Sequence, residues 1–186
     1  SRLPPDLVAV SLQDISERAW TEEALRHKTA LFEAQLHSST DGIIVADTTG
    51  KKILQNLRVA EIWKIPKNAA DDPDDALQIR HMKGMVRDPE GFAARASHLL
   101  SHPYETGNDM VDLIDGTIIE RYSAPVIGKN GKNYGRIWKY RDITEQRNAE
   151  LALKESEEKF RRVVERAPAG IFIAIDGRFA YLNPAA

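Results

Sequence analysis

The sequence predicts an α+β fold, in which a five-stranded antiparallel sheet carries helices on one face and is flanked by long amphipathic linker helices. One observation is an internal repeat, because the pair Asp14-Ile15 recurs as Asp142-Ile143. Another is the order of the segments between the two copies, which gives two short strands, several helices and three further strands. A repeat of this length corresponds to a whole domain, so we expect one complete domain between two partial ones.

The repeat keeps its register and sets the domain limits. The matching pairs are Leu25 with Leu153, Phe32 with Phe160, Gly42 with Gly170 and, after one deleted residue, Asn56 with Asn183. The five expected parts are the C-terminal strand of a preceding domain (1–15), an incoming linker helix (16–38), a complete domain (39–143), an outgoing linker helix (144–167) and the N-terminal hairpin of a following domain (168–186).

The first half of the chain predicts strands on both sides of a helix. Residues 7–12 are rich in β-forming residues and predict a strand, and Asp14 with Glu17 predicts a capping box before the helix. Residues 43–47 and 52–56 predict a hairpin, because a turn containing glycine separates two short apolar runs. The helices expected next span residues 57–65, 75–86 and 89–101.

The second half predicts an antiparallel meander, because turn signals at Asp115-Gly116 and 128–131 separate three runs of β-forming residues. The expected strands span residues 108–113, 117–125 and 133–141. The capping-box pattern then recurs at Asp142 and Glu145, ahead of the outgoing helix.

Composition excludes several classes of partner and site. Hydrophobic residues make up 42% of the chain and charged residues 29%, which suits a globular domain with charged helices. The net charge of −2 does not favour nucleic acid or an anionic membrane as a partner. The absence of Cys excludes disulfides, Cys-ligated metals and thiol-linked cofactors. Because the chain has no initiator Met and stops just after a predicted strand, we expect a fragment of a longer cytoplasmic protein, whose membrane anchor, if it has one, lies outside these residues.

Four segments carry a resemblance to a known family. They are Asp41-Gly42-Ile43-Ile44-Val45-Ala46-Asp47 with Asn56, Glu61-Ile62-Trp63-Lys64-Ile65-Pro66, the run from Asp115 to Pro125, and the run from Gly135 to Thr144. In this order they resemble a PAS domain, the sensory module of bacterial signalling proteins. The resemblance implies the strand order 2-1-5-4-3, with the last strand beside the first. It also implies a sensory or relay and dimerisation module of a multi-PAS protein, whose output domain, a histidine kinase or diguanylate cyclase, lies outside this chain.

The resemblance further implies a cavity between the inner face of the sheet and the helices, where an unknown small ligand could bind. The candidate lining residues are Ile44, Ala46, Leu54, Trp63, Leu77, Met82, Met85, Phe92, Ile118, Tyr122, Ile137 and Trp138. The alternative is that these apolar side chains form an ordinary core around no ligand.

Cofactor and metal sites have weaker support, and none is predicted. Haem-binding PAS relatives use a helical His as axial ligand, for which His81, His98 and His102 are the candidates. His98 and His102 also share one helical face, but no third metal ligand stands out. Non-covalent flavin has no specific signal. A haem- or flavin-dependent sensor therefore stays open as an alternative. The acidic run Asp71, Asp72, Asp74 and Asp75 lacks the glycine and terminal glutamate of a calcium loop.

The resemblance assigns signal coupling to the junction between the sheet and the outgoing helix, at Asp142 and Thr144. Asp14 and Ser16 are their equivalents in the preceding copy. The simpler interpretation is a plain helix cap, and the two roles are compatible, because a cap fixes where the helix begins.

The outgoing helix predicts a dimer seam with heptad spacing. The seam positions are Ala149, Leu153, Ser156, Phe160, Val163 and Ala167, and their apolar equivalents on the incoming helix are Leu25 and Phe32. We expect a homodimer through the linker helices. We also expect the adjacent PAS and output domains of the same polypeptide to be partners of this module. The alternative is an amphipathic helix that lies on its own domain.

Enzyme chemistry is not expected in this chain. It has no phosphate-binding glycine loop and no recognisable nucleophile–base set. A purely structural spacer and a catalytic domain remain the less favoured alternatives.

Overall fold

The computed structural model describes residues 5–70, 75–175 and 178–185, with side chains from residue 19 onward except those of residues 178 and 179. The chain divides into two compact units, residues 1–142 and 143–186. No helix in these described ranges is long and apolar enough to cross a membrane.

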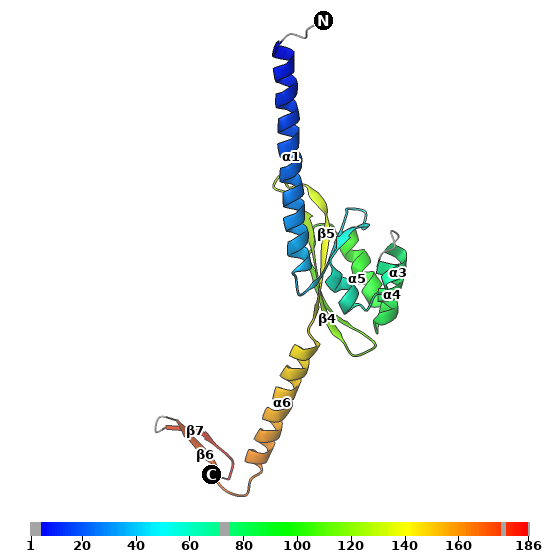
Figure 1. Cartoon of the computed structure of the whole chain (residues 1–186). Coiled ribbons are helices and arrows are strands. Elements are labelled where there is room, and N and C mark those ends of the chain that lie inside the picture. The colour runs from blue at the N-terminus through cyan, green and yellow to red at the C-terminus, as the bar shows by residue number, and fades with distance from the viewer. Residues whose placement is uncertain (1–4, 71–74, 176–177, 186) are drawn as a thin grey trace. The chain divides into compact units, whose positions relative to one another are not determined.

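The first unit begins with helix α1 (Pro5–His37), so the prediction of a strand at residues 7–12 is wrong (Figure 1). A strand satisfies its backbone only by pairing with a neighbour, whereas a helix forms its hydrogen bonds within the segment. None of the described strands pairs with residues 7–12, which explains why local β propensity does not decide this segment.

A five-stranded antiparallel sheet forms the centre of this unit, in the order β2-β1-β5-β4-β3. Its strands are β1 (Gly42–Ala46), β2 (Lys52–Gln55), β3 (Gly107–Asp112), β4 (Ile118–Ile127) and β5 (Asn133–Asp142). The order 2-1-5-4-3 and the central position of the last strand beside the first are both as expected. Ile44 of β1 faces Trp138 of β5, which in turn faces Ser123 of β4.

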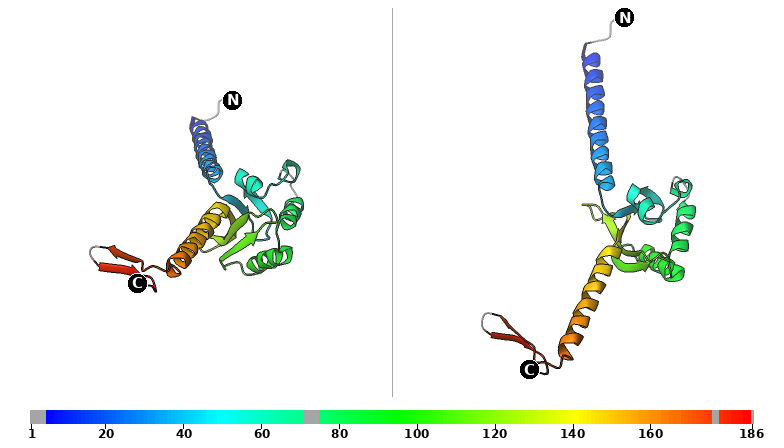
Figure 2. Two further views of the ribbon diagram at one scale, coloured as in Figure 1. Left: turned by 90° about the horizontal axis from the view of Figure 1, so that it is seen from below. Right: turned by 60° about the horizontal axis from the view of Figure 1, so that its bottom comes forward.

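Four helices lie in the described residues between β2 and β3, and Figures 1 and 2 show α3, α4 and α5 gathered on one face of the sheet. They are α2 (Leu57–Ile62), α3 (Lys67–Ala70), α4 (Asp75–Met85) and α5 (Pro89–Ser101). Helix α5 begins with a side-chain cap, because Asp88 Oδ1 accepts the backbone N–H of Gly91 at 2.9 Å, and Pro89 follows it.

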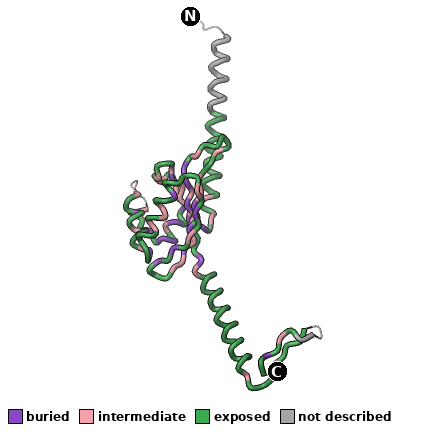
Figure 3. Tube along the Cα trace, turned by 180° about the vertical axis from the view of Figure 1, so that it is seen from behind, coloured by how far each residue is buried: buried purple, intermediate pink, exposed green. Residues whose placement is uncertain are grey.

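The core lies between the helices and the inner face of the sheet, where Figure 3 shows the buried residues concentrated. Successive side chains of a strand point to opposite faces. On β5, Arg136, Trp138 and Tyr140 are therefore buried on the inner face, while Ile137 and Lys139 point to the outer face and are partly exposed. The largest fully buried apolar side chains outside β5 are Trp63, Leu99, Leu113, Ile119 and Val59.

The second unit consists of helix α6 (Thr144–Glu165) followed by a hairpin of β6 (Phe172–Ile175) and β7 (Arg178–Leu182). This hairpin occupies the segment that the repeat predicts for the start of a following domain. The division of residues 1–15 and 168–186 into parts of neighbouring domains stays a prediction.

Candidate functional site

A cavity of about 150 Å³ lies between the inner face of the sheet and helices α4 and α5. Strand residues contribute one wall and helix residues the other. The lining residues are Ile44, Ala46, Gly50, Lys52, Asp75, Gln78, Ile79, Met82, Phe92, Ala96, Leu100, Arg121, Trp138 and Tyr140. The wall is mostly apolar, with polar groups at two places.

The first polar region of the wall is a hydrogen-bond network centred on Lys52. The Lys52 backbone N–H donates to Asp75 Oδ2 at 2.7 Å, and its Nζ lies 3.2 Å from Asp75 Oδ1. Lys52 Nζ also donates to Gln78 Oε1 at 2.8 Å, and Gln78 Nε2 donates to Gln55 Oε1 at 2.7 Å. These contacts tie β2 to α4, so the network closes this end of the cavity with partly buried polar groups.

The second polar region of the wall is Arg121 of β4, whose side chain is only 1% exposed. Its Nε donates to Asp109 Oδ1 at 3.0 Å, its Nη2 to Asp109 Oδ2, and its Nη1 to the Phe92 carbonyl at 3.2 Å. The guanidinium also lies 4.6 Å from the centroid of the Phe92 ring. Because Asp109 already balances its charge, Arg121 does not present an unpaired cation to a ligand.

Tyr140 and Phe92 line the cavity, and both pack against Trp63 in the core behind it. Tyr140 stands edge-on to Trp63, with ring centroids 5.3 Å apart, and Trp63 lies 5.6 Å from Phe92. Burial raises the pKa of the Tyr140 hydroxyl well above its usual value. The phenol is therefore neutral at physiological pH, and the cavity as a whole suits a small, largely uncharged molecule.

The structure places the predicted lining residues in two groups. Ile44, Ala46, Met82, Phe92 and Trp138 line the cavity as expected. The other predicted positions are not on its wall, and they are Leu54, Trp63, Leu77, Met85, Ile118, Tyr122 and Ile137.

Strand alternation, together with a register shift in the β1–β2 pair, explains three of the wrong predictions. Val45 pairs with both Leu54 and Ile137, and this trio points to the face of the sheet opposite Trp138. Tyr122 shares that outer face, where it is 40% exposed.

Two further predicted residues, Trp63 and Met85, pack into the core instead of lining the cavity. Sequence reasoning also missed the polar wall residues Lys52, Asp75, Gln78 and Arg121, because it considered only apolar side chains as candidates.

The outer face of the sheet is organised around a buried carboxylate. Asp41 Oδ1 accepts from Arg141 Nε at 2.9 Å, and Asp41 Oδ2 lies 2.7 Å from Lys139 Nζ. The hydrogen bond from Arg141 is the main cause that holds the pKa of Asp41 below its ordinary value, and the hydrogen bond from Lys139 adds to it. Tyr122 lines a groove beside these cations, so its surroundings are polar and solvent-facing.

The predicted coupling residues lie at the junction of β5 and α6 and inside α1. The N-cap position of α6 is Ile143, with Thr144 as the first helical residue, so the assignment of Asp142 as the N-cap is wrong by one position. Asp142 instead ends β5, where it pairs with Ile119. Asp14 and Ser16 lie within α1 and not at its start, and their side chains fall outside the described residues.

The predicted seam residues are exposed within their own units. Leu153, Phe160 and Val163 on α6 are 62%, 64% and 65% exposed, and Leu25 and Phe32 on α1 are 64% and 48% exposed. The dimer stays a prediction.

None of the candidate haem ligands His81, His98 and His102 lines the cavity. His81 Nε2 is 3.0 Å from the Trp63 carbonyl oxygen. Of the acidic run, Asp71, Asp72 and Asp74 lie outside the described residues, and Asp75 belongs to the Lys52 network.

Comparison with known proteins agrees with this geometry. A family model described as a PAS domain matches residues 158–186, the segment in which the repeat begins again. The complete copy of that repeat has the sheet order 2-1-5-4-3 over residues 42–142. The chain has the sheet order of a PAS fold over residues 42–142 and a PAS family match over residues 158–186. The cavity and its lining therefore lie in a PAS fold.

Proteins similar to this chain include sporulation kinase E of Bacillus subtilis (strain 168), which is 26% identical over 196 residues. That match covers 97% of this chain but only 24% of the kinase, so the chain spans about a quarter of its relative.

Two solved structures are also similar. The PAS domain of a protein from Colwellia psychrerythraea is 22% identical, with 66% of this chain and 98% of that chain covered and a TM-score of 0.41. The PAS domain of Bordetella pertussis BvgS is 18% identical, with 72% and 98% covered and a TM-score of 0.49.

Proposed function

We propose that this chain is a sensory and relay module of a signalling histidine kinase, in which the PAS domain passes a conformational signal to the linker helices. The observation that carries the proposal is the continuity of β5 with α6. Strand β5 supplies Trp138 and Tyr140 to the cavity wall, ends at Asp142, and is followed after one residue by α6. A change at the cavity therefore acts on the strand that leads into the helix.

The similarity to sporulation kinase E along nearly the whole chain supports a kinase as the output. No comparison favours the diguanylate cyclase that the sequence analysis also allowed. We assign no catalytic step to the PAS module itself, so its contribution would be to bias the output domain between states that differ in their fit to the linker helix.

We propose that the signal is a small, mostly apolar molecule in the cavity. A volume of about 150 Å³ is comparable to cavities that admit benzene and is below the range of roughly 300–1,000 Å³ for drug-sized ligands. The Lys52 ammonium group would orient one polar group of such a molecule, since it has three N–H donors and contacts only Gln78 Oε1 and Asp75 Oδ1 among the described side chains.

Methionine-methyl NMR tests the cavity, because the chain has three methionines in different surroundings. Met82 lines the cavity, Met85 packs against the core elsewhere, and Met110 is exposed. We expect benzene, used as a probe, to shift the Met82 signal and to leave that of Met110 unchanged. Ala96→Phe should fill the cavity and abolish the shift, whereas Ala94→Phe, on an exposed position of the same helix, should not.

The relay is tested separately in the full-length protein that carries the output domain. Ala96→Phe should change autophosphorylation at least several-fold relative to Ala94→Phe, because only the former alters the wall shared with β5. A Met82 signal that ignores the probe would refute the ligand site. Equal autophosphorylation in both variants would refute the relay and leave the ligand site standing.

A further inference from the structure

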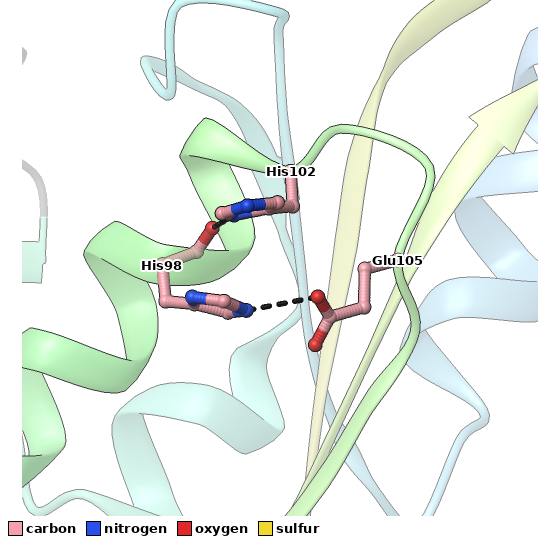
Figure 4. Close-up of side chains that lie close together, drawn as sticks. All are labelled: His98, His102 and Glu105. Atoms are coloured by element: carbon pink, nitrogen blue, oxygen red, sulfur yellow. Dashed lines mark hydrogen bonds and ion pairs between the residues drawn. The ribbon is translucent and has the colours of Figure 1, made fainter.

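A cluster of potential metal ligands lies where α5 ends, apart from the cavity (Figure 4). His98 and His102 are on the last turn of α5 and just beyond it, and Glu105 follows in the loop before β3. One ligand atom from each side chain lies within 4.8 Å of the other two. We propose that His98, His102 and Glu105 form a binding site for a divalent transition-metal ion such as Zn²⁺.

The donor set fits this chemistry, because imidazole nitrogens and a carboxylate oxygen are ordinary zinc ligands. His102 Nδ1 lies 2.8 Å from the His98 carbonyl oxygen. A carbonyl oxygen only accepts, so Nδ1 carries the proton and the lone pair of His102 is on Nε2. A backbone carbonyl commonly orients metal-binding histidines in this way.

The distances require only a small adjustment for an ion to enter. His98 Nε2 is 2.8 Å from Glu105 Oε2, and the two imidazole rings stack with centroids 4.1 Å apart. Ligand atoms around a tetrahedral zinc ion lie about 3.4 Å apart, given Zn–N and Zn–O bonds of roughly 2.0–2.1 Å. The proton that His98 Nε2 donates to Glu105 Oε2 would pass to Nδ1 or to solvent, so that the Nε2 lone pair can bind the ion. His98 and Glu105 would then separate slightly and His102 would move closer, leaving a fourth position for water.

One neighbouring cation shares the carboxylate with this site. Arg95 Nη1 lies 3.1 Å from Glu105 Oε1, whereas His98 faces the other oxygen, Oε2. Arg95 therefore holds Glu105 in place and leaves Oε2 for the ion. Its charge disfavours a second cation nearby, so we expect micromolar and not nanomolar affinity.

The loop that carries the site is attached to the central strand of the sheet. Arg136 of β5 donates through Nη2 to the His102 carbonyl at 3.1 Å and to the Glu105 carbonyl at 2.9 Å. Its Nη1 donates to Ser123 Oγ at 3.0 Å. Ion binding would thus restrain a loop that is bonded directly to β5, and the site would give the domain a second input, independent of the cavity.

Isothermal titration with Zn²⁺ tests the site, using protein without a histidine tag and freed of metal by a chelator. We expect one ion per chain. His98→Gln, His102→Gln and Glu105→Gln should each weaken binding about tenfold or more. His27→Gln on α1 and Glu90→Gln at the start of α5, both exposed side chains, should bind as the unaltered protein does. Circular dichroism confirms that each variant is folded.

Visible absorption of bound Co²⁺ gives a second readout, because it reports the geometry and donor set of the ion directly. The unaltered protein should show tetrahedral bands that are lost in His102→Gln. Three results would overturn the proposal: no heat at 100 µM Zn²⁺, unchanged affinity in a His98→Gln/His102→Gln double variant, or a ratio of one ion to two chains, which would place the site between copies.

Discussion

Asn56 and Asn183 make the same set of hydrogen bonds in the two copies of the repeat. Asn56, which is 2% exposed, accepts the Ile43 backbone N–H at 2.8 Å through Oδ1. Its Nδ2 donates to the Asp41 carbonyl at 2.8 Å and to the Leu36 carbonyl at 2.9 Å. One side chain therefore joins the end of a linker helix, the loop after it and the first strand of the hairpin.

Asn183 repeats this arrangement at the equivalent positions. It accepts from Ile171 N–H at 2.7 Å and donates to the carbonyls of Ala169 and Val164, both at 3.0 Å. All of these partners are the positions that the repeat register assigns. The match in hydrogen bonding supports the internal repeat independently of any sequence count.

Asn56→Ala should destabilise the first unit by roughly 2–4 kcal/mol, because it leaves buried backbone groups without partners. Urea unfolding gives the free energy directly. Asn68→Ala, at an exposed position of α3, serves as the control and should change stability little. A loss below about 1 kcal/mol in Asn56→Ala would mean that water replaces the amide without difficulty.

Replacing Asp41 should alter how stability depends on pH. Its pKa in the folded protein is lowered below the ordinary value of 3.8 by Arg141 and then Lys139. The carboxylate therefore stabilises the fold above pH 3.8, and this contribution is lost as the pH falls through the lowered pKa.

Asp41→Asn should accordingly be less stable than the unaltered protein at neutral pH, and the difference should shrink below pH 3.8. Unfolding in urea at a series of pH values measures it. A difference that stays constant from neutral pH to pH about 2.5 would refute the ionic role.

Arg121 and Asp109 should behave as a coupled pair. Arg121→Met leaves the Asp109 carboxylate without its main partner and should cost about 3–5 kcal/mol. The double variant Arg121→Met/Asp109→Leu should cost less than the sum of the two single changes. A double-mutant cycle by urea unfolding measures the coupling, and strict additivity would contradict it.

The seam on α6 predicts that a Leu153→Glu/Phe160→Glu variant is monomeric, because four carboxylates would lie along one two-helix interface. Sedimentation measures the association state, and circular dichroism should show the fold intact. Leu151→Glu is the matched control, since Leu151 is 56% exposed but lies off the heptad seam. A monomeric unaltered protein would refute the seam, as would a variant that remains dimeric.

Turn residues and apolar periodicity were sufficient to predict most of the fold. The strand expected at residues 133–141 is observed at Asn133–Asp142, and the helix expected at 89–101 at Pro89–Ser101. The strand predicted at residues 7–12 was wrong because β propensity is a property of the segment alone, whereas a strand also needs a neighbouring strand to pair with.

The cavity was predicted less completely, for reasons of direction and charge. Ile137 and Trp138 are adjacent in sequence, yet alternation sends only Trp138 into the cavity. Arg121 was missed because a buried guanidinium needs partners, here Asp109 and the Phe92 carbonyl, that come from distant segments. Glu105 was missed as a companion of the two histidines because it lies past the helix, in a turn where helical spacing no longer applies.

The bonds of Asn56 have a thermodynamic consequence for the cavity. Strand β1 contains Ile43, whose backbone N–H donates to Asn56. The same strand contains Ile44 and Ala46, which line the cavity. Coupling between two sites is reciprocal: if ligand binding shifts the linker helix, then fixing that helix must change ligand affinity by the same factor. The dissociation constant of this module would then depend on whatever holds the far end of α1, so an affinity measured on the isolated chain would differ from that in a longer protein.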